Sequence, residues 1–319
     1  DTPCLYHAMP TLDRNLLHRF GLLFVILLVG LGLTLTTDTF LSVANLTNVA
    51  RQVSINGILA VGVTFVLLTA GVDLSLGSVV ALSGVACAIF AHPGEHPVIV
   101  PIAVGLLTGA ACGLVNGVLV TRGGVAPFIV TLGMMTIARG LALILSGGRP
   151  VANMSESLTS LAGDVWDIPI PVLCFAIVSA LAWFFLRDFR LGRHLYAVGG
   201  NENAARAAGI SVERVKLFAY VVCGLLTGLA GVVLAARITT GQPNAGQAYE
   251  LDAIAAVVIG GTSLSGGVGT ITGTLLGVLL IGVINNGLDL LGVSSYYQAV
   301  IKGVIIVGAV WLDRRQARS

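Results

Sequence analysis

Charged residues are scarce in this chain: Asp, Glu, Lys and Arg together make up 10% of its 319 residues. Soluble domains carry roughly a quarter charged residues, so the scarcity excludes an ordinary soluble protein. Aromatic residues are also few, at 6%, whereas 56% of the chain is hydrophobic and the mean hydropathy is +0.96. The composition therefore predicts an integral membrane protein.

Cysteine and lysine are rare as well, which excludes several kinds of site. The five cysteines stand singly, with no C-x-x-C pair to indicate a disulfide framework or a zinc site. Neither of the two lysines, Lys216 and Lys302, follows a glycine, so the chain has no G-x-x-x-x-G-K-[ST] phosphate loop. Serines in the apolar runs lack a His or Lys at matching depth to activate them. We therefore expect no catalytic residue, metal or cofactor here, and any nucleotide chemistry must belong to another protein.

One stretch formally fits a metal-binding signature, since HPGEH at 92–96 matches H-x-x-E-H. That signature requires a helix that places both histidines on one face. The Pro-Gly pair inside it opposes a helix, so we interpret the stretch as the polar tip of a hairpin.

Long apolar runs with almost no charge occupy most of the chain. A helix of ~20 such residues crosses a ~30 Å hydrocarbon core, and helices fit these runs better than the alternating ten-residue strands of a barrel. The sequence predicts an all-α polytopic membrane protein of about ten transmembrane helices. They are expected at about 20–37, 53–70, 74–91, 98–120, 126–145, 169–186, 216–236, 251–263, 270–288 and 297–312.

These runs form one transmembrane domain, predicted at 20–313, because no polar stretch is long enough to fold alone. A cytoplasmic segment at 1–19 precedes it and a basic cytoplasmic tail at 314–319 follows it. The first run lacks a small-residue cleavage pattern, so we interpret it as a retained span and not a signal peptide.

Lys and Arg are unevenly distributed between the two sides that these spans define. The side holding both termini has twelve of them, whereas the other side has three, Arg51, Arg149 and Arg237. By the positive-inside rule both termini are cytoplasmic. The formal net charge of only +2 indicates neither nucleic acid nor an acidic ligand as a partner.

Glycine is abundant, at 41 residues, and it recurs every fourth position in several spans. One row runs from Gly105 to Gly117, another from Gly269 to Gly277, and Gly224 with Gly228 makes a third pair. Such rows let helix backbones approach closely, and we favour packing within this chain over a subunit interface. A weak internal similarity also links AGVDLSLG (70–77) with GGTSLSGG (260–267).

Few ionisable groups lie at membrane depth. Arg139 and Lys302 are expected to pair with Asp289, Asp252 or carbonyl groups inside the bundle. Asp73, with Ser75, is expected to cap the helix that follows, its carboxylate accepting from the free N–H groups of the first turn. A gate on the cytoplasmic side is the alternative for this pair.

The spans contain neutral polar side chains that a solute could contact. Amides suit hydroxyl-rich molecules because they donate and accept hydrogen bonds without carrying a charge. Hydrogen bonding between helices is the favoured interpretation for any one of them. The candidates for a translocation pathway are Asn56, Asn116, Phe128, Thr131, Asn285 and Asn286.

A polar stretch at 187–215 interrupts the apolar pattern on the cytoplasmic side. Within it, Asn201 can cap a short helix over 202–208, Glu202 and Arg206 are spaced to pair, and Gly209 can end the helix. Seven residues do not hold a helix alone in water, so this one must be docked. A short projecting helix rich in small residues suits contact with a separate motor subunit. The expected coupling residues are Gly199, Gly200, Asn201, Glu202, Asn203, Ala204, Ala205, Arg206, Gly209 and Ile210.

Four ordered motifs resemble a known family. They are NLTNVARQVSINGILAVGVTFVLLTAGVDLSLGS (45–78), GGVAPFIVTLGMMTIARGLA (123–142), GRHLYAVGGNENAARAAGI (192–210) and IAAVVIGGTSLSGGVGTITGTLLGVLLIGVINNGL (254–288). Together they look like the membrane subunit of bacterial ATP-binding-cassette (ABC) sugar importers, the ribose permease group, over about 20–312.

The resemblance implies that the chain lies in the bacterial inner membrane and works with several partners. Two permease chains would form the pore, a cytoplasmic ATPase subunit would hold ATP and Mg, and a periplasmic sugar-binding protein would deliver a neutral monosaccharide. It places the coupling helix at about 199–210. As a further hypothesis, Arg51, Arg149 and Arg237 attract acidic residues of the binding protein.

Several alternatives stay open at this point. An ion-coupled secondary carrier for a neutral solute is one, and a non-transporting membrane scaffold or sensor is another. Ribose, xylose, allose, galactose or a polyol would each fit the same motifs. A homodimer is favoured over a heterodimer because the chain carries one complete coupling helix.

Overall fold

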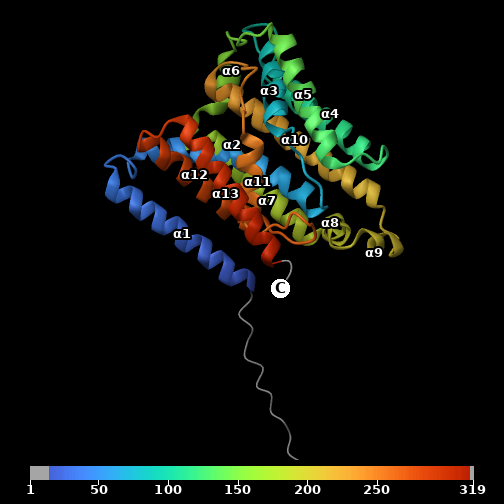
Figure 1. Ribbon diagram of the computed structural model, residues 1–319. Coiled ribbons are helices and arrows are strands. Elements are labelled where there is room, and N and C mark those ends of the chain that lie inside the picture. The colour runs from blue at the N-terminus through green and yellow to red at the C-terminus, as the bar shows by residue number, and fades with distance from the viewer. Residues whose placement is uncertain (1–13, 317–319) are drawn as a thin grey trace, which may run out of the picture.

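The protein is seen in a computed structural model that describes residues 14–316 (Figure 1). Each of the ten segments predicted to span the membrane holds a helix. Six of them, α2, α4, α5, α7, α10 and α12, are long and apolar enough to cross a membrane. A polytopic helical membrane protein is therefore confirmed as the class, while ten crossings stay a prediction. The helices are α1 (Arg14–Thr36), α2 (Val43–Leu68), α3 (Leu76–Ile89), α4 (Ile99–Thr121), α5 (Pro127–Ser146), α7 (Ile170–Asp188), α10 (Val212–Ile238), α11 (Tyr249–Ile259), α12 (Ile271–Leu290) and α13 (Ser295–Gln316).

The start of α2 differs from the predicted span by ten residues, 43 against 53. Three of the polar residues that mark the predicted boundary are paired within the fold. Arg51 binds Asp164, Asn48 accepts from Arg237, and Asn45 pairs with Asn286. Because these partners satisfy the polar side chains, the helix continues through them.

The predicted terminal segments are only partly described. Residues 1–13 and 317–319 lie outside the described residues, and with them most of the cytoplasmic segment at 1–19 and half of the tail at 314–319. The remainder of both segments is helical, since α1 begins at Arg14 and α13 runs to Gln316.

The segment between α5 and α7 has structure of its own. It contains α6 (Glu156–Thr159), a short 3-10 helix (Ser160–Ala162) and a hairpin of two-residue strands, β1 (Asp164–Val165) and β2 (Ile168–Pro169). This hairpin is a small departure from the all-α expectation within residues 14–316. The stretch 92–96 lies in a loop, as expected from its Pro-Gly pair.

The polar stretch 187–215, predicted to be a cytoplasmic coupling loop, is not a loop with a single short helix. Its first half forms α8 (Arg190–Gly200), and α9 (Glu202–Ala207) follows after one residue. Helix α8 is not predicted from the sequence, because its apolar residues are spaced on one face among Arg and His and do not form a run. Figure 1 shows both helices together at one end of the bundle.

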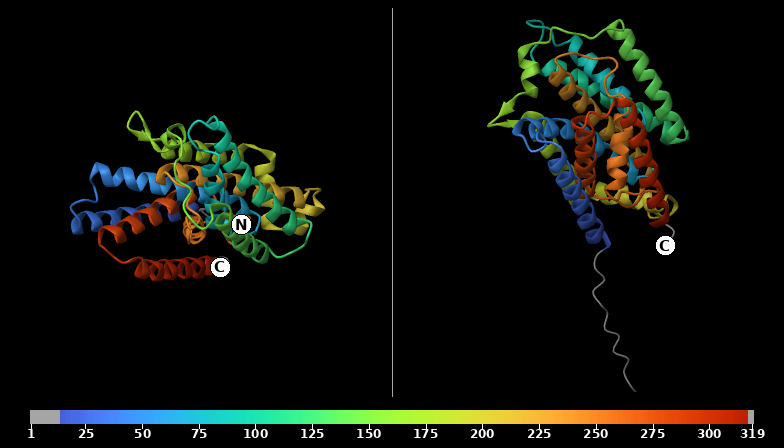
Figure 2. Two further views of the ribbon diagram at one scale, coloured as in Figure 1. Left: turned by 90° about the horizontal axis from the view of Figure 1, so that it is seen from above. Right: turned by 60° about the vertical axis from the view of Figure 1, so that its left-hand side comes forward.

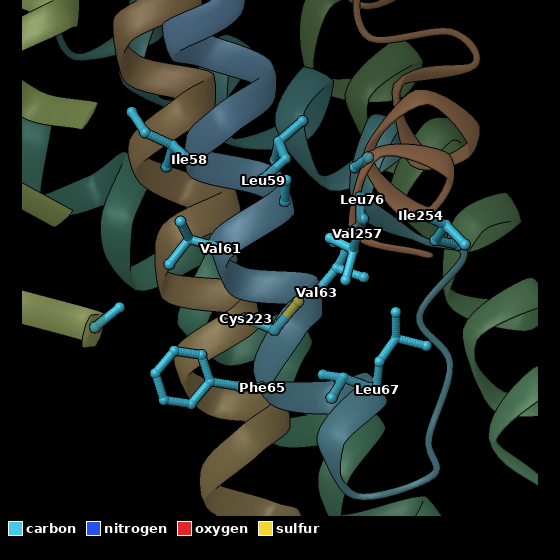
Figure 3. Close-up of a cluster of buried hydrophobic side chains, with 14 of the residues drawn as sticks. Ile58, Leu59, Val61, Val63, Phe65, Leu67, Leu76, Cys223, Ile254 and Val257 are labelled. Atoms are coloured by element: carbon cyan, nitrogen blue, oxygen red, sulfur yellow. The ribbon is translucent and has the colours of Figure 1, made fainter. Parts of the chain in front are cut away.

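The core of the bundle is built around α2 and α10. The part of α2 from Val53 to Leu68 is almost wholly buried, and α10 packs against α2 as well as against α3 and α4. Figure 3 shows α2 side chains such as Leu59 and Val63 meeting Cys223 of α10, Leu76 of α3 and Val257 of α11. At the periphery, α1 packs on α12 and α13 packs on α11 (Figure 2).

The glycine rows form contacts within the chain, as the sequence analysis favours. A Cβ on Gly109 of α4 would lie 2.6 Å from the Gly228 Cα of α10 and would collide with the Gly224 carbonyl. A Cβ on Gly273 or Gly277 of α12 would likewise collide with the backbone of Gly260 or Ala256. We call the α4–α10 contact the glycine seam. Only residues without a side chain allow these backbones to meet.

We expect Gly109→Ala to destabilise the protein, because the new methyl group meets backbone that cannot move aside. Overpacking of this kind costs ~1–3 kcal/mol, and the melting temperature in mild detergent should fall by about 5 °C. Gly133→Ala on α5 is the matched control, since nothing lies within 4 Å of its Cβ position. An equal melting temperature for Gly109→Ala and the wild type would contradict the close packing.

Candidate functional site

The short helix α9 has a sequence-encoded start and stop. The Asn201 side chain accepts a hydrogen bond of 2.9 Å from the Ala204 N–H, which caps the first turn. At the other end Gly209 adopts a φ of +82°, and the Ile210 N–H donates to the Ala205 carbonyl at 3.0 Å. This is a Schellman ending, for which glycine is the favoured residue. The predicted cap and stop are both confirmed.

Two ion pairs hold the exposed side of α9. Glu202 contacts Arg206 at 3.1 Å, as its i,i+4 spacing predicts. Its other carboxylate oxygen accepts a hydrogen bond of 2.6 Å from Lys216 in the first turns of α10. This second pair is not among the sequence predictions, although Lys216 is one of only two lysines in the sequence and stands near the start of the next helix.

The hydrogen bond from Lys216 lowers the pKa of Glu202 below its ordinary value of 4.5, and Arg206 acts in the same direction. A lowered pKa means that ionised Glu202 stabilises the folded segment above about pH 4.5. The stabilisation is lost as the pH falls through the lowered pKa. At neutral pH the link between α9 and α10 is therefore fully formed.

The helix α9 is docked on one face and free on the other. Ala205 is buried, and Ile210 packs against the hydrophobic core. Asn203, Ala204 and Arg206 are exposed, so a partner has access to a surface of small and polar side chains. Gly199 and Gly200, expected to open this segment, instead end α8, with Gly199 turned toward the bundle and Gly200 exposed.

A second polar group lies inside the bundle, around Asp252 at the start of α11. Its carboxylate accepts from Lys302 of α13 at 2.9 Å and from Asn285 of α12 at 3.3 Å. This confirms the expectation that Lys302 pairs with an acidic residue inside the bundle. Asn56 and Gln52 of α2 line the same cavity, and the amide oxygens of Asn56 and Asn285 have no hydrogen-bond partner within the described residues.

The free space in this cavity is about 10 Å³, which is room for one water molecule and not for a solute. Two of the pathway candidates, Asn56 and Asn285, lie together because both line this cavity. The conformation described here is closed around them.

Asp73 belongs to a separate buried cluster at the break between α2 and α3. Its carboxylate accepts from the Ser75 N–H at 2.8 Å and from the Ser75 hydroxyl at 2.6 Å. Asn116 of α4 donates to the same hydroxyl at 3.1 Å. The expected cap is thus corrected: α3 begins only at Leu76, so the carboxylate bonds the residue before the helix and not the N–H groups of its first turn.

The remaining pathway candidates are dispersed. Asn286 exchanges two hydrogen bonds with Asn45, at 2.8 and 3.0 Å, and so serves helix packing. Thr131 is buried and donates to the Pro127 carbonyl of its own helix. Phe128 is exposed on the outside of α5. Arg139 donates to two carbonyls in the segment before α11. Pairing with carbonyl groups is one of the expectations for this residue.

The three cations expected on the outer side differ in their surroundings. Arg51 forms an ion pair of 2.6 Å with Asp164 of the hairpin. Arg237 donates to the Asn48 side chain at 2.8 Å. Arg149 is exposed just after α5. Within residues 14–316, no group of three or more His, Cys, Asp and Glu is arranged to hold a metal ion.

A bundle of long apolar helices with a small docked helix at one end is the architecture of a multi-pass membrane protein. The family described as "Branched-chain amino acid transport system / permease component" matches residues 45–310. The chain belongs to this family.

Its relatives include several sugar permeases. The ribose import permease protein RbsC of Escherichia coli K12 is 46% identical over 308 residues, covering 94% of this chain and 95% of the relative. The RbsC protein of Bacillus subtilis is 47% identical, covering 93% and 92%. The D-allose transport system permease protein AlsC of Escherichia coli K12 is 41% identical, covering 93% and 91%. No solved structure matches the chain.

We expect Lys302→Met to loosen the attachment of α13, because it leaves the Asp252 carboxylate buried without its cation. Breaking such a pair costs on the order of 3 kcal/mol, and the melting temperature should fall accordingly. The double change Lys302→Met, Asp252→Asn should recover most of the loss, since it removes both charges. A Lys302→Met protein as stable as wild type would show that the pair does not hold α13.

A second prediction concerns α9. Lys216→Met should raise amide hydrogen exchange over residues 202–208 by about threefold at pH 7, because the helix loses its link to α10. Arg206→Met is the control for a more exposed pair and should have a smaller effect. Equal exchange in Lys216→Met and wild type would contradict a role for this pair in docking α9.

Proposed function

We propose that this chain is the transmembrane permease subunit of an ABC importer that moves a neutral, ribose-like monosaccharide across the bacterial inner membrane by alternating access. The observation that carries the proposal is α9, a capped and docked helix of six residues whose free face is exposed at the end of the bundle. A carrier driven by an ion gradient has no need of such a helix, whereas a separate ATPase needs a surface to act on. ATP and Mg would be bound by that ATPase and not by this chain.

The family description names branched-chain amino acids, but two observations favour a sugar. Relatives sharing 41–47% identity over nearly the whole chain are permeases for ribose and allose. The interior cations are also already engaged, Lys302 by Asp252 and Arg139 by backbone carbonyls. An amino acid carries a carboxylate that needs a cation, whereas a sugar needs neutral donors and acceptors such as the amides of Asn56 and Asn285.

The sidedness follows from the same proposal. With ten crossings and both termini in the cytoplasm, α9 faces the ATPase and the segment around α6 faces the periplasm. A sugar-loaded binding protein would dock there, and Arg149 is the exposed cation best placed to meet an acidic residue on it. Arg51 and Arg237 would contribute less, because Asp164 and Asn48 already hold them.

The pore would lie between two copies of this chain. Each copy carries one α9, so a homodimer presents two equivalent surfaces to an ATPase dimer. Exposed apolar side chains on α1, α5 and α7 would meet lipid or the second copy. Asn56, Asn285 and their neighbours would become accessible to the solute when the cavity opens.

The proposal predicts that tagged protein in mild detergent captures an ATPase from its host, and that Ala204→Arg on the free face of α9 abolishes capture. An arginine there fills the space that small residues leave for a partner. Ala126→Arg, an exposed alanine between α4 and α5 on the same predicted side, is the matched control and should bind normally.

Uptake of radiolabelled ribose in cells that express the whole system completes the test. Uptake should depend on ATP and be lost with Ala204→Arg. Absence of any ATPase, together with uptake that an uncoupler abolishes at constant ATP, would replace the proposal with an ion-coupled carrier.

A further inference from the structure

Two interruptions of the helical bundle lie far apart in the chain. The first separates α2 from α3 at residues 69–75, where Ala70 has a φ of +57°. The second separates α11 from α12 at residues 260–270, where Gly266 and Gly267 have φ values of +83° and +73°. These are the segments whose sequences, AGVDLSLG and GGTSLSGG, are similar.

The two breaks are joined directly to each other. The last carbonyl of α2, that of Leu68, has no donor within its own helix because the chain turns away at Ala70. It accepts instead a hydrogen bond of 3.0 Å from the Gly267 N–H in the other break. A Cβ on Gly266 would lie 2.9 Å from the Cβ of Ala70, so the backbones also touch beside this bond.

The end of α8 lies on top of this bond. A Cβ on Gly199 would collide with the Leu68 carbonyl oxygen and would lie 2.5 Å from the Gly267 nitrogen. Three residues earlier on α8, the Tyr196 hydroxyl donates to the Gly269 carbonyl at 3.0 Å. One end of one helix thus contacts both breaks, and Gly199 sits at the hydrogen bond that joins them.

The connection from this point to α9 is short and capped. Asn201 alone separates α8 from α9, and its side chain is fixed by its bond to the Ala204 N–H. Because this connection is short and fixed, a displacement of α9 would also displace Gly199 at the end of α8. The first break is in turn bonded to α10, since the Tyr220 hydroxyl donates to the Val72 carbonyl at 3.2 Å.

We propose that the end of α8 is the joint through which a displacement of α9 reaches both helix breaks at once, and that Gly199 is a positioning residue for transport. This inference rests on the proposed function, because it requires an ATPase to move α9. Packed elements of this kind switch between discrete arrangements, and a coupled pair of breaks would let both halves of the bundle switch together.

The test compares Gly199→Ala with Gly133→Ala, the same substitution on α5 at a residue outside the coupling segment. The methyl group of the first meets the joint, whereas nothing lies within 4 Å of the Cβ position of the second. Each variant is purified with its ATPase and placed in proteoliposomes with a ribose-binding protein. Radiolabelled ribose uptake and phosphate release from ATP are measured on the same sample.

For Gly199→Ala we expect ATP hydrolysis within about twofold of wild type and ribose uptake per ATP lower by about tenfold, since overpacking disturbs the switch and not the ATPase. Gly133→Ala should keep the wild-type ratio. The ratio is a readout that a merely structural defect, which lowers the amount of assembled complex, does not change.

A wild-type ratio in Gly199→Ala would overturn the inference. Where that variant does not assemble, Tyr196→Phe takes its place, because it removes only the hydroxyl bonded to Gly269. A lowered ratio in Tyr196→Phe supports the joint, and an unchanged ratio overturns it. Failure of the proposed function has a different signature, since the wild type would then neither bind an ATPase nor take up ribose.

Discussion

Hydrocarbon offers no hydrogen-bond partner, so every polar group that this chain places at membrane depth has to find its partner inside the protein. Several buried side chains follow this constraint, whereas the amide oxygens of Asn56 and Asn285 have no partner within the described residues. Asp252 is met by Lys302 and Asn285, and the Asn45 and Asn286 amides bond each other reciprocally. The backbone follows it as well, because the carbonyl at the end of α2 is satisfied by an N–H from a distant break. Polar pairing therefore decides which helices are neighbours.

Close packing is the second requirement, and the glycines meet it. Interior helices such as α2 bury large aliphatic side chains, as Figure 3 shows, while α4 and α10 meet through glycine with backbone against backbone. Membrane helices gain no hydrophobic energy from leaving lipid, so this van der Waals contact and the hydrogen bonds between helices hold the bundle. Glycines also allow close backbone contact where α8 meets the two breaks.

Local features of the chain could be predicted from its sequence, and long-range pairs could not. The cap at Asn201, the pair between Glu202 and Arg206 and the stop at Gly209 all lie within nine residues, so spacing alone indicates them. The predicted start of α2 was wrong because Asn45, Asn48 and Arg51 have partners 113 to 241 residues away in the sequence. Helix α8 was missed for want of an apolar run. The gathering of Asn56 and Asn285 around Asp252, and the dispersal of Thr131 and Phe128, likewise depend on which helices pack together.

The glycine seam between α4 and α10 also limits how this protein can move. An interface lined by long side chains can adopt new rotamers and slide, but a seam of bare backbone has no rotamers to change. Helices α4 and α10 must therefore travel as one rigid body, together with the α3 helix that packs on both. Any hinge has to lie outside this seam, and the two helix breaks at 69–75 and 260–270 are such places. The part of the bundle with the smallest residues is thus its stiffest part.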